Sequence, residues 1–255
     1  MTHITEQREP GIMPYDTYGD PANPTLLLLH GAAATDTFCH QYEFQDHWFL
    51  VVPHLPGSGR AMNRVYDPEE TLAALAALVR SFHTNRVAVM GHSLGGELAV
   101  GLVSRYPELF SRAVFLSAWV CASDKSIRTY TRIARWSSTT LRMKFLLRWQ
   151  ARYWGYTPEQ AAFLVEYASR ITSEQYVAWF SRRIRLDELP GYASVSIPML
   201  AVCGSKEVAE MRHSLVELGR RNPHCRTRVL DGLNHDFPLR APDRINPILR
   251  AFLEG

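Results

Sequence analysis

Short apolar runs alternate with helical patterns along most of the chain. The runs are continuous and bounded by turn residues, as in strands buried on both faces of a sheet. They predict strands at residues 25–30, 49–53, 86–91, 113–119, 198–204 and 226–232, with a further extended pair around residues 11–19. Apolar positions at helical spacing predict helices at residues 67–82, 94–107, 207–221 and 241–255, the last interrupted by Pro247. This alternation indicates an α/β fold with a mostly parallel central sheet.

One interval in this pattern is much longer than the others. About eighty residues, 120–197, separate the fourth and fifth long strands, and loops of that length rarely lack structure of their own. Helical patterns recur within the interval at residues 127–138, 141–155 and 157–171. We therefore expect two parts, a core formed by residues 1–119 and 198–255 and an inserted helical cap formed by residues 120–197.

The predicted cap is unevenly charged. From Lys125 to Arg152 it has eight basic residues and no acidic residue, and Trp136, Trp149 and Trp154 are interleaved with them. Two functional interpretations are attraction of an anionic substrate and contact with a membrane surface. The structural alternative is a solvated basic helix face with the tryptophans packed beneath it, because charge runs usually face water.

Composition narrows the class of protein without identifying a partner. The 255 residues suit one large domain or a core with an inserted subdomain, and a net charge of +3 gives no reason to expect a nucleic-acid partner. No signal peptide is visible at the polar start, and no apolar run approaches the roughly 18 residues that span a bilayer. Four widely spaced cysteines predict reduced thiols and a cytoplasmic location. The histidines lack metal-ligand spacing, so we expect no metal.

The stretch "VAVMGHSLGGELAV" at residues 87–100 places a serine between two glycines. A G-x-S-x-G pattern arises by chance in roughly one chain in ten of this length, so the pattern alone is weak. Here it follows a predicted strand and opens a predicted helix, which is the setting of a nucleophile elbow. Ser93 would then present its hydroxyl at a helix N-terminus, while Gly91 and Gly95 allow the strand and the helix to approach closely.

A serine hydroxyl needs a base, and the base needs a carboxylate to orient it. His235 lies in the loop after the last predicted strand, where such a base is expected. Glu207, three residues after Gly204, is our predicted carboxylate, and its structural alternative is a helix cap. Asp124, beyond the fourth long strand, is the rival carboxylate.

Two other acids near the histidine are less suitable as its partner. Asp236 adjoins His235 and can hardly reach its ring, and Asp231 is expected in a turn.

Backbone donors for an oxyanion are expected at two places. One is the N–H of Leu94, directly after the serine, and the other is the N–H of Ala32 in the loop "HGAAAT". His30 is expected to brace that loop. A competing nucleophile pair, Cys39 and His40, is disfavoured because adjacent side chains rarely converge on one reacting atom.

Together these stretches resemble the α/β-hydrolase fold superfamily. The residues that carry the resemblance are "LLLLHGAAAT", "VVPHLPGSGR", "VAVMGHSLGGELA", "MLAVCGSKE" and "LNHDFP", in the order serine, acid, histidine. The resemblance implies a mostly parallel sheet of about eight strands, flanking helices, a cap after the sixth strand, and hydrolysis of an ester-like bond without a cofactor. Two positions depart from the family pattern: His54 replaces an acid in "HLPGSG", and the triad acid is a glutamate.

The sequence therefore predicts a serine hydrolase with Ser93, His235 and Glu207 as the triad. Its expected substrate is a small or medium carboxylic ester, or a related thioester or amide, and the basic cap favours an anionic one. The alternatives are a non-catalytic ligand receptor on the same fold, and a cofactor-free haloperoxidase or carbon–carbon hydrolase that uses the same triad.

Overall fold

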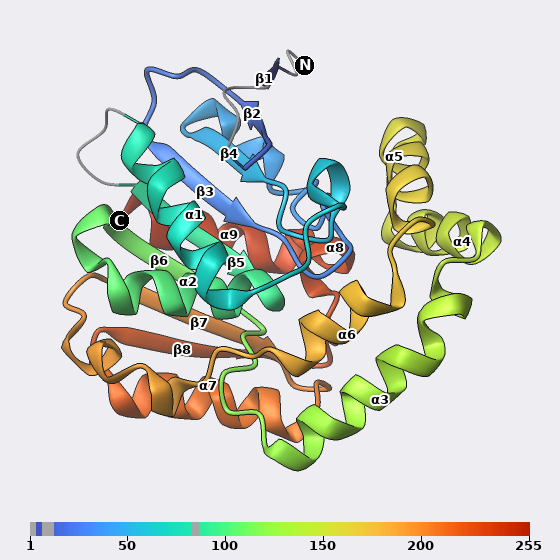
Figure 1. Cartoon of the computed structure of the whole chain (residues 1–255). Coiled ribbons are helices and arrows are strands. Elements are labelled where there is room, and N and C mark those ends of the chain that lie inside the picture. Colours follow the sequence, from blue (N-terminus) through green and yellow to red (C-terminus); the bar gives the residue numbers. More distant parts are fainter. Residues whose placement is uncertain (1–3, 7–12, 83–86) are drawn as a thin grey trace.

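The computed structural model describes residues 4–6, 13–82 and 87–255. In these residues eight strands form one sheet in the order β1-β2-β4-β3-β5-β6-β7-β8 (Figure 1). Among the described strands, β2 pairs antiparallel with both of its neighbours and the remaining pairs are parallel. The strands are β1 Ile4–Glu6, β2 Tyr15–Tyr18, β3 Thr25–Leu29, β4 Phe49–Pro53, β5 Val87–His92, β6 Phe110–Leu116, β7 Met199–Gly204 and β8 Cys225–Leu230. The predicted fold class, a mostly parallel sheet of about eight strands, is confirmed.

The central strands are buried on both faces, which explains their continuous apolar runs. In β3, Leu27 and Leu29 belong to the core on one face of the sheet, while Leu26 and Leu28 belong to the core on the other. Successive side chains of a strand point to opposite faces, so a strand covered on both sides needs apolar residues at every position.

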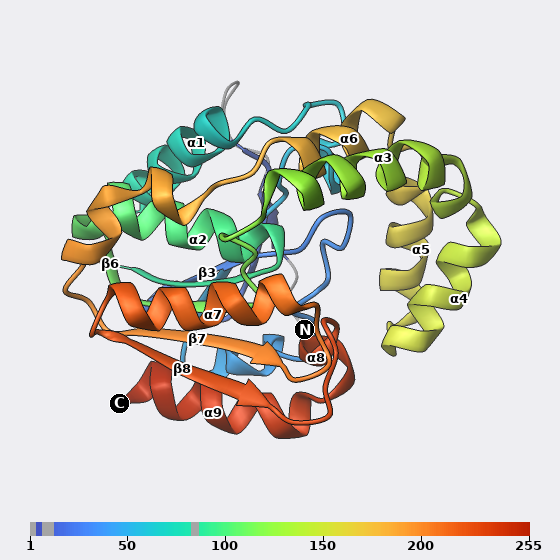
Figure 2. The same cartoon turned by 90° about the horizontal axis from the view of Figure 1, so that it is seen from below.

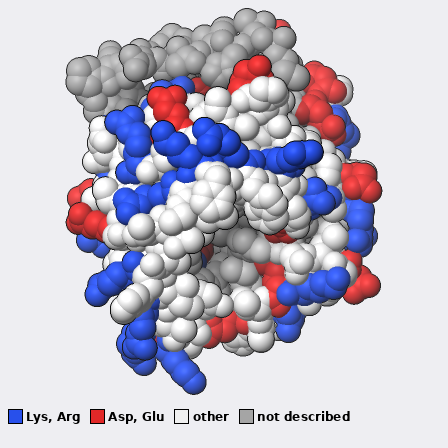
Figure 3. All heavy atoms as spheres, turned by 90° about the vertical axis from the view of Figure 1, so that its right-hand side faces the viewer, with Lys and Arg blue, Asp and Glu red and all other residues white. Residues whose placement is uncertain are grey.

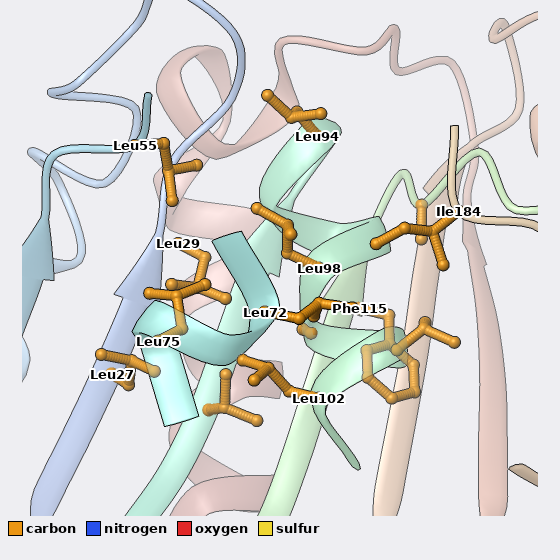
Figure 4. Close-up of a cluster of buried hydrophobic side chains, with 14 of the residues drawn as sticks. Leu27, Leu29, Leu55, Leu72, Leu75, Leu94, Leu98, Leu102, Phe115 and Ile184 are labelled. Carbon is orange, nitrogen blue, oxygen red and sulfur yellow. The ribbon is translucent and has the colours of Figure 1, made fainter. Parts of the chain in front are cut away.

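Helices cover both faces of the sheet (Figures 1 and 2). On one face lie α1 Pro68–Ser81, α2 Leu94–Arg105 and α7 Ala209–Arg221, and on the other lie the short α8 Phe237–Arg240 and α9 Pro242–Glu254. Figure 4 shows apolar side chains of α1 and α2 packed onto the central strands.

Two local signals in the helices had different outcomes. Asp67 accepts hydrogen bonds from the backbone N–H groups of Glu69 and Glu70 and so begins α1 where its capping pattern predicts. The predicted interruption at Pro247 is wrong, because α9 continues through this proline. Ile245 before this proline and Leu249 and Leu253 after it are buried, and they hold the helix against the sheet on both sides of the proline.

The bounds of β6 differ most from the predicted ones, and parts of two other predicted strands lie outside the described residues. β6 begins at Phe110 and ends at Leu116, three residues earlier than predicted at each end. Arg86, the first residue of the predicted third strand, lies outside the described residues. So do residues 11 and 12 of the predicted extended pair, within which β2 forms.

Four helices lie between β6 and β7 and stand at one end of the sheet (Figure 2). They are α3 Asp124–Leu141, α4 Lys144–Trp154, α5 Pro158–Ala168 and α6 Ser173–Ser181. The first three were expected from the helical patterns, whereas α6 was not. Its signal was the reciprocal cap at its start, in which the side chains of Thr172 and Gln175 each bond the other's backbone N–H.

The rest of this interval returns to the core. After α6 the chain runs along α2, where Gly191 lies against the carbonyl oxygen of Ser104 and Tyr192 is buried. The helices α3–α6 therefore stand apart from the sheet, while the segment that follows them is packed into the main core. We keep the name "cap" for α3–α6.

The tryptophans of the cap do not all pack beneath a basic face. Trp136 is 81% exposed and Trp149 is 65% exposed, while Trp154 is half-buried. The structural alternative from the sequence is therefore wrong for the first two residues. Helical spacing predicted the helices, but the surface against which each helix packs depends on distant parts of the chain.

Candidate active site

Ser93 lies at the sharp turn between β5 and α2. Its backbone has φ 55° and ψ −116°, a conformation that side-chain-bearing residues rarely adopt. A Cβ atom on Gly91 would overlap the carbonyl of Gly95, and one on Gly95 would overlap the carbonyl of Leu29. The two glycines thus let the strand and the helix cross at backbone contact, and the turn holds the hydroxyl at the end of the sheet.

His235 lies in the loop after β8, which is tied to the neighbouring loop after β7. The Ser205 side chain accepts from the backbone N–H of Gly232, and the Lys206 N–H donates to the carbonyl of Leu233. Nε2 of His92, in the elbow, lies 2.8 Å from the carbonyl oxygen of His235 and donates to it. These bonds hold the histidine loop against both the elbow and the β7 loop.

His92 itself is a neutral ring. Burial and, to a smaller extent, the nearby His235 ring lower its pKa to about 3. Its Nδ1 atom is buried and has no hydrogen-bond partner among the described residues. His92 therefore positions the neighbouring loop and does not exchange protons near neutral pH.

Glu207 reaches His235 from the loop after β7. Its Oε2 atom lies 2.8 Å from Nδ1 of His235, and its side chain has no solvent exposure. Oε1 accepts from the backbone N–H of Gly204 at 2.7 Å and from the hydroxyl of Ser117 at 2.8 Å.

The pKa of Glu207 follows from this environment. Burial alone would raise it, but the hydrogen bond and charge of His235, together with the Gly204 and Ser117 donors, hold the pKa below its ordinary value. The group is therefore a carboxylate near neutral pH, and Nδ1 of His235 carries the shared proton. In a neutral His235 ring, Nε2 is then the free base.

Ser117 is a residue that the sequence analysis missed. It follows β6, has φ 51°, and its N–H donates to the carbonyl of Val202. No local pattern marks it, because its contact with Glu207 joins two loops 90 residues apart in the chain.

The rival acids lie elsewhere. Asp124 is at the start of α3, where it accepts from Arg185 at 2.7 Å on the surface. Asp231 accepts from the Ser205 hydroxyl, and Asp236 precedes α8. The structure thus brings Glu207, and not Asp124, to the ring of His235.

The loop after β3 lies beside Ser93. An ideal Cβ on Gly31 would be 3.6 Å from Cβ of Ser93, and the backbone N–H of Gly31 donates to Thr37. The N–H of Ala32 has no partner among the described residues, and the N–H of Leu94, as the first residue of α2, has none within the helix.

His30 braces this loop. Its Nδ1 donates to the carbonyl of Gly31 at 2.6 Å, and its Nε2 accepts from the N–H of Leu55 at 3.1 Å. Burial lowers its pKa to about 3, so the ring is neutral and occupied on both sides.

His54, which replaces the family's usual acid, is held in the same manner. It is buried, accepts from the N–H of Arg60 at Nδ1, and lies 2.9 Å from Asp16 through Nε2. The carboxylate missing from this loop is thus supplied by Asp16 of strand β2, which also pairs with Arg60.

Cys39 does not have the character of a nucleophile. Burial and, to a smaller extent, the carboxylate of Asp36 raise the pKa of its thiol to about 12.

Ser93, Glu207 and His235 line one cavity of about 380 Å³. The remaining wall is mostly apolar and aromatic, and it includes two cations. Arg183 is buried against Glu97 as an ion pair and lies over the ring of Trp119, whereas Lys206 has no ion pair among the described residues. The other lining residues are Trp119, Tyr130, Phe180, Val208, Met211 and Asn234.

The three predicted residues are not joined by a continuous chain of hydrogen bonds. His235 bonds Glu207, but the hydroxyl of Ser93 has no hydrogen-bond partner among the described residues. Catalytic hydrogen bonds are often long in ligand-free enzymes and tighten when substrate binds. Across the described residues, no three or more His, Cys, Asp or Glu side chains cluster as metal ligands.

Known proteins are similar to this chain in sequence or in structure. A curated relative from Acinetobacter baylyi, (E)-2-((N-methylformamido)methylene)succinate hydrolase, is 21% identical over 251 residues, which is 90% of each chain. Among solved structures, E-2-(acetamidomethylene)succinate hydrolase superposes with a TM-score of 0.79 at 18% identity over the whole of both chains.

A third similar protein comes from a study of carboxylesterases of the thaumarchaeon Nitrososphaera gargenis. Its structure has a TM-score of 0.75 at 19% identity, and the match covers 99% of this chain and 98% of that one.

None of the described helices is long and apolar enough to cross a bilayer. The model of the alpha/beta hydrolase family matches residues 26–248, and the chain belongs to that family.

Proposed function

We propose that this hydrolase cleaves small or medium carboxylic esters with Ser93, His235 and Glu207 as its triad. The observation that supports the proposal best is the 2.8 Å contact between the buried carboxylate of Glu207 and Nδ1 of His235, in the wall of the cavity that Ser93 also lines. This contact leaves Nε2 of His235 unprotonated on the side from which a serine proton is taken.

In the proposed reaction, Nε2 of His235 takes the proton of Ser93 as the hydroxyl oxygen attacks the ester carbonyl. Glu207 holds the ring in the required tautomer and stabilises the imidazolium that forms. The backbone N–H groups of Ala32 and Leu94 donate to the oxyanion, and the dipole of α2 favours the same negative charge.

His235 then protonates the leaving alcohol, and the carbon–oxygen bond to it breaks. The product of this half-reaction is an ester between the substrate acid and Ser93. Water attacks that ester in the second half while His235 accepts a proton from the water. The bond between the acyl carbon and Oγ of Ser93 then breaks, His235 passes the proton to Oγ, and the acid is released.

The cavity supports a substrate of limited size that carries a negative charge. A volume of about 380 Å³ is at the small end of ligand pockets. Its aromatic wall suits an apolar acyl or alcohol group, and Lys206 can bind a carboxylate on the substrate. The succinate named for two similar hydrolases is consistent with an anionic substrate.

A fluorophosphonate probe tests the nucleophile. We expect the wild-type protein to be labelled and Ser93→Ala, with an unchanged thermal midpoint, to remain unlabelled. A well-folded wild-type protein that resists the probe would contradict the proposal and favour the non-catalytic receptor.

A substrate panel tests the class of bond. We expect aryl esters of short acyl chains to be hydrolysed in a Ser93-dependent manner, faster when the acid carries a second carboxylate. The matched thioesters, amides and carbon–carbon substrates belong in the same panel, because the relatives named for succinate derivatives favour an acylamino substrate as the second candidate. Hydrolysis of those compounds alone would replace the ester assignment and keep the triad.

The four cysteines are free thiols, which supports the cytoplasm as the place where the protein acts.

A further inference from the structure

Helix α4 carries two parallel rows of side chains on its exposed side. Phe145, Trp149 and Tyr153 are spaced by four residues and are all exposed, with Phe145 at 63% and Trp149 at 65%. Residues four apart lie on one face of a helix. The row directly beside it consists of the exposed basic residues Lys144, Arg148 and Arg152. The opposite side of the helix is the one that packs, through Leu147 and Ala151.

Exposed apolar side chains continue from α4 back into α3. Trp136 is 81% exposed, and Ile133 lies one turn before it. Leu141 and Met143, at the turn between the two helices, are exposed as well. Water-exposed aromatic and aliphatic side chains in such density mark interaction surfaces in monomeric proteins. We call the exposed apolar residues Ile133, Trp136, Leu141, Met143, Phe145, Trp149 and Tyr153 the cap apolar face.

Positive charge borders the cap apolar face. Eight basic residues and no acidic residue lie between Lys125 and Arg152, and none of the eight forms an ion pair with a described carboxylate. Figure 3, which views the molecule from the side of the cap, shows basic side chains bordering an uncharged area. The described part of the chain therefore does not balance the charge of this surface with ion pairs.

This combination of chemistry selects the partner. Two copies of the chain that met through this face would bring like charges together, which disfavours self-association. Aliphatic and aromatic side chains gain from entering hydrocarbon, and adjacent lysines and arginines gain from anionic headgroups. An anionic lipid bilayer offers both in one plane.

We propose that the cap apolar face and the basic row beside it dock the protein on the surface of an anionic membrane. The apolar row enters the interface, and Lys144, Arg148 and Arg152 contact lipid phosphates. No helix crosses the bilayer in this arrangement, because the contact needs only one face of α4 and the end of α3.

The cap apolar face contacts helix α8 of the core. Tyr153, the last member of the apolar row, stacks on Trp149, and the guanidinium of Arg240 lies 4.5 Å from the centre of its ring. Arg240 also donates to the Tyr153 carbonyl at 2.7 Å. Arg240 ends α8, the helix that begins two residues after His235. A docked membrane would thus lie beside the part of the cap that contacts α8.

Vesicle flotation tests the proposal directly. The wild-type protein should float with vesicles of phosphatidylcholine and phosphatidylglycerol and not with pure phosphatidylcholine, and added salt should weaken binding. Lys144→Glu/Arg148→Glu/Arg152→Glu should lower the partition coefficient at least about hundredfold, at about fivefold per charge removed. Phe145→Ala/Trp149→Ala should lower it at least about tenfold.

Control variants on the core test whether binding to vesicles depends on this face, or only on net charge and exposed apolar area anywhere on the protein. Arg226→Glu/Arg228→Glu reverses exposed charges on β8, and Val216→Ala removes an exposed apolar side chain of α7. Both should float as well as wild type. Every variant should keep the wild-type thermal midpoint and the wild-type rate on a soluble ester.

Three outcomes would overturn the proposal. The wild-type protein does not float with anionic vesicles at low salt, or the α4 variants float as well as the β8 control. The third is a wild-type dimer that dissociates in Phe145→Ala/Trp149→Ala, which would assign the face to a second copy. Ser93→Ala should float like wild type, so failure of the proposed catalysis and failure of docking are distinguishable.

Discussion

The loops at the end of the sheet bury a charged side chain, whereas the helices of the cap leave large apolar side chains exposed. In the loops, the carboxylate of Glu207 is buried and accepts from His235, Gly204 and Ser117. In the cap, Trp136 and Trp149 face water. The loops fix groups that must hold one geometry, whereas the cap helices pack through narrow stripes and leave large side chains outside. The contrast places the proposed chemistry in the core and the proposed membrane contact in the cap.

The largest expected effect comes from replacing each of the two candidate carboxylates with its amide. Glu207→Gln replaces the carboxylate that holds the tautomer of His235 with a neutral amide, and we expect kcat to fall by about 10⁴-fold. Asp124→Asn, at the base of the cap, is the matched control and should leave kcat unchanged. Steady-state kinetics on the best ester of the panel decides between them. A large loss in Asp124→Asn with a small one in Glu207→Gln would move the acid to the cap.

Two glycines, one in the core and one in the cap, should differ in how much an alanine substitution lowers the free energy of unfolding. An added Cβ at Gly95 would overlap the backbone of β3, so Gly95→Ala should cost more than about 4 kcal/mol in the free energy of unfolding. Gly155, which ends α4 with φ 75°, has only Nε2 of His40 near that position, at 3.9 Å.

Gly155→Ala should therefore cost only about 1 kcal/mol, the strain of a left-handed alanine. Chemical denaturation measures both values. Equal losses would show that the crossing of β5 and α2 is looser than its backbone contacts indicate.

A pair of tryptophans sharpens the comparison of burial. Trp179 of α6 is 1% exposed and donates to the carbonyl of Pro56 at 3.1 Å, which joins the cap to the core. Trp179→Ala should cost about 3–5 kcal/mol. Trp149→Ala should change stability by no more than about 0.5 kcal/mol, because its side chain already faces water. A loss at Trp149 as large as that at Trp179 would mean that the cap apolar face is covered within the protein.

The same two regions show what the sequence could predict. The Ser93 turn follows from local sterics, since the glycines on either side must lack side chains for strand and helix to cross. The contact of Glu207 with His235 follows from the place of each residue after a strand, because neighbouring parallel strands deliver their loops to one edge. The catalytic roles of these residues stay predictions until the kinetic tests are made.

Contacts between residues far apart in the chain could not be predicted from the sequence. Ser117 reaches Glu207 across 90 residues, and no periodicity marks such a bond. Asp16 supplies the charge that the substitution at His54 removes, again from a distant strand. In the cap, helical spacing predicted three helices, but the burial of each face was decided by packing. Trp136 and Trp149 are consequently exposed although they were weighed as packed residues.

The smallest expected effect concerns the acid limit of stability. The pKa of Glu207 is lowered in the folded protein from an ordinary value of 4.5, so its charge stabilises the fold above that pH. This contribution is lost as the pH falls through the lower, folded-state pKa. The difference in free energy of unfolding between wild type and Glu207→Gln should be constant near neutral pH and shrink below about pH 4.5.

Glu159, at the start of α5, is the cap control. Its pKa is also lowered, by hydrogen bonds at its helix start, but it is fully exposed to water. Glu159→Gln should therefore follow the wild-type pH curve. If Glu207→Gln follows that curve as well, the buried carboxylate contributes no net charge-dependent stability, and the contrast between the two regions is one of packing alone.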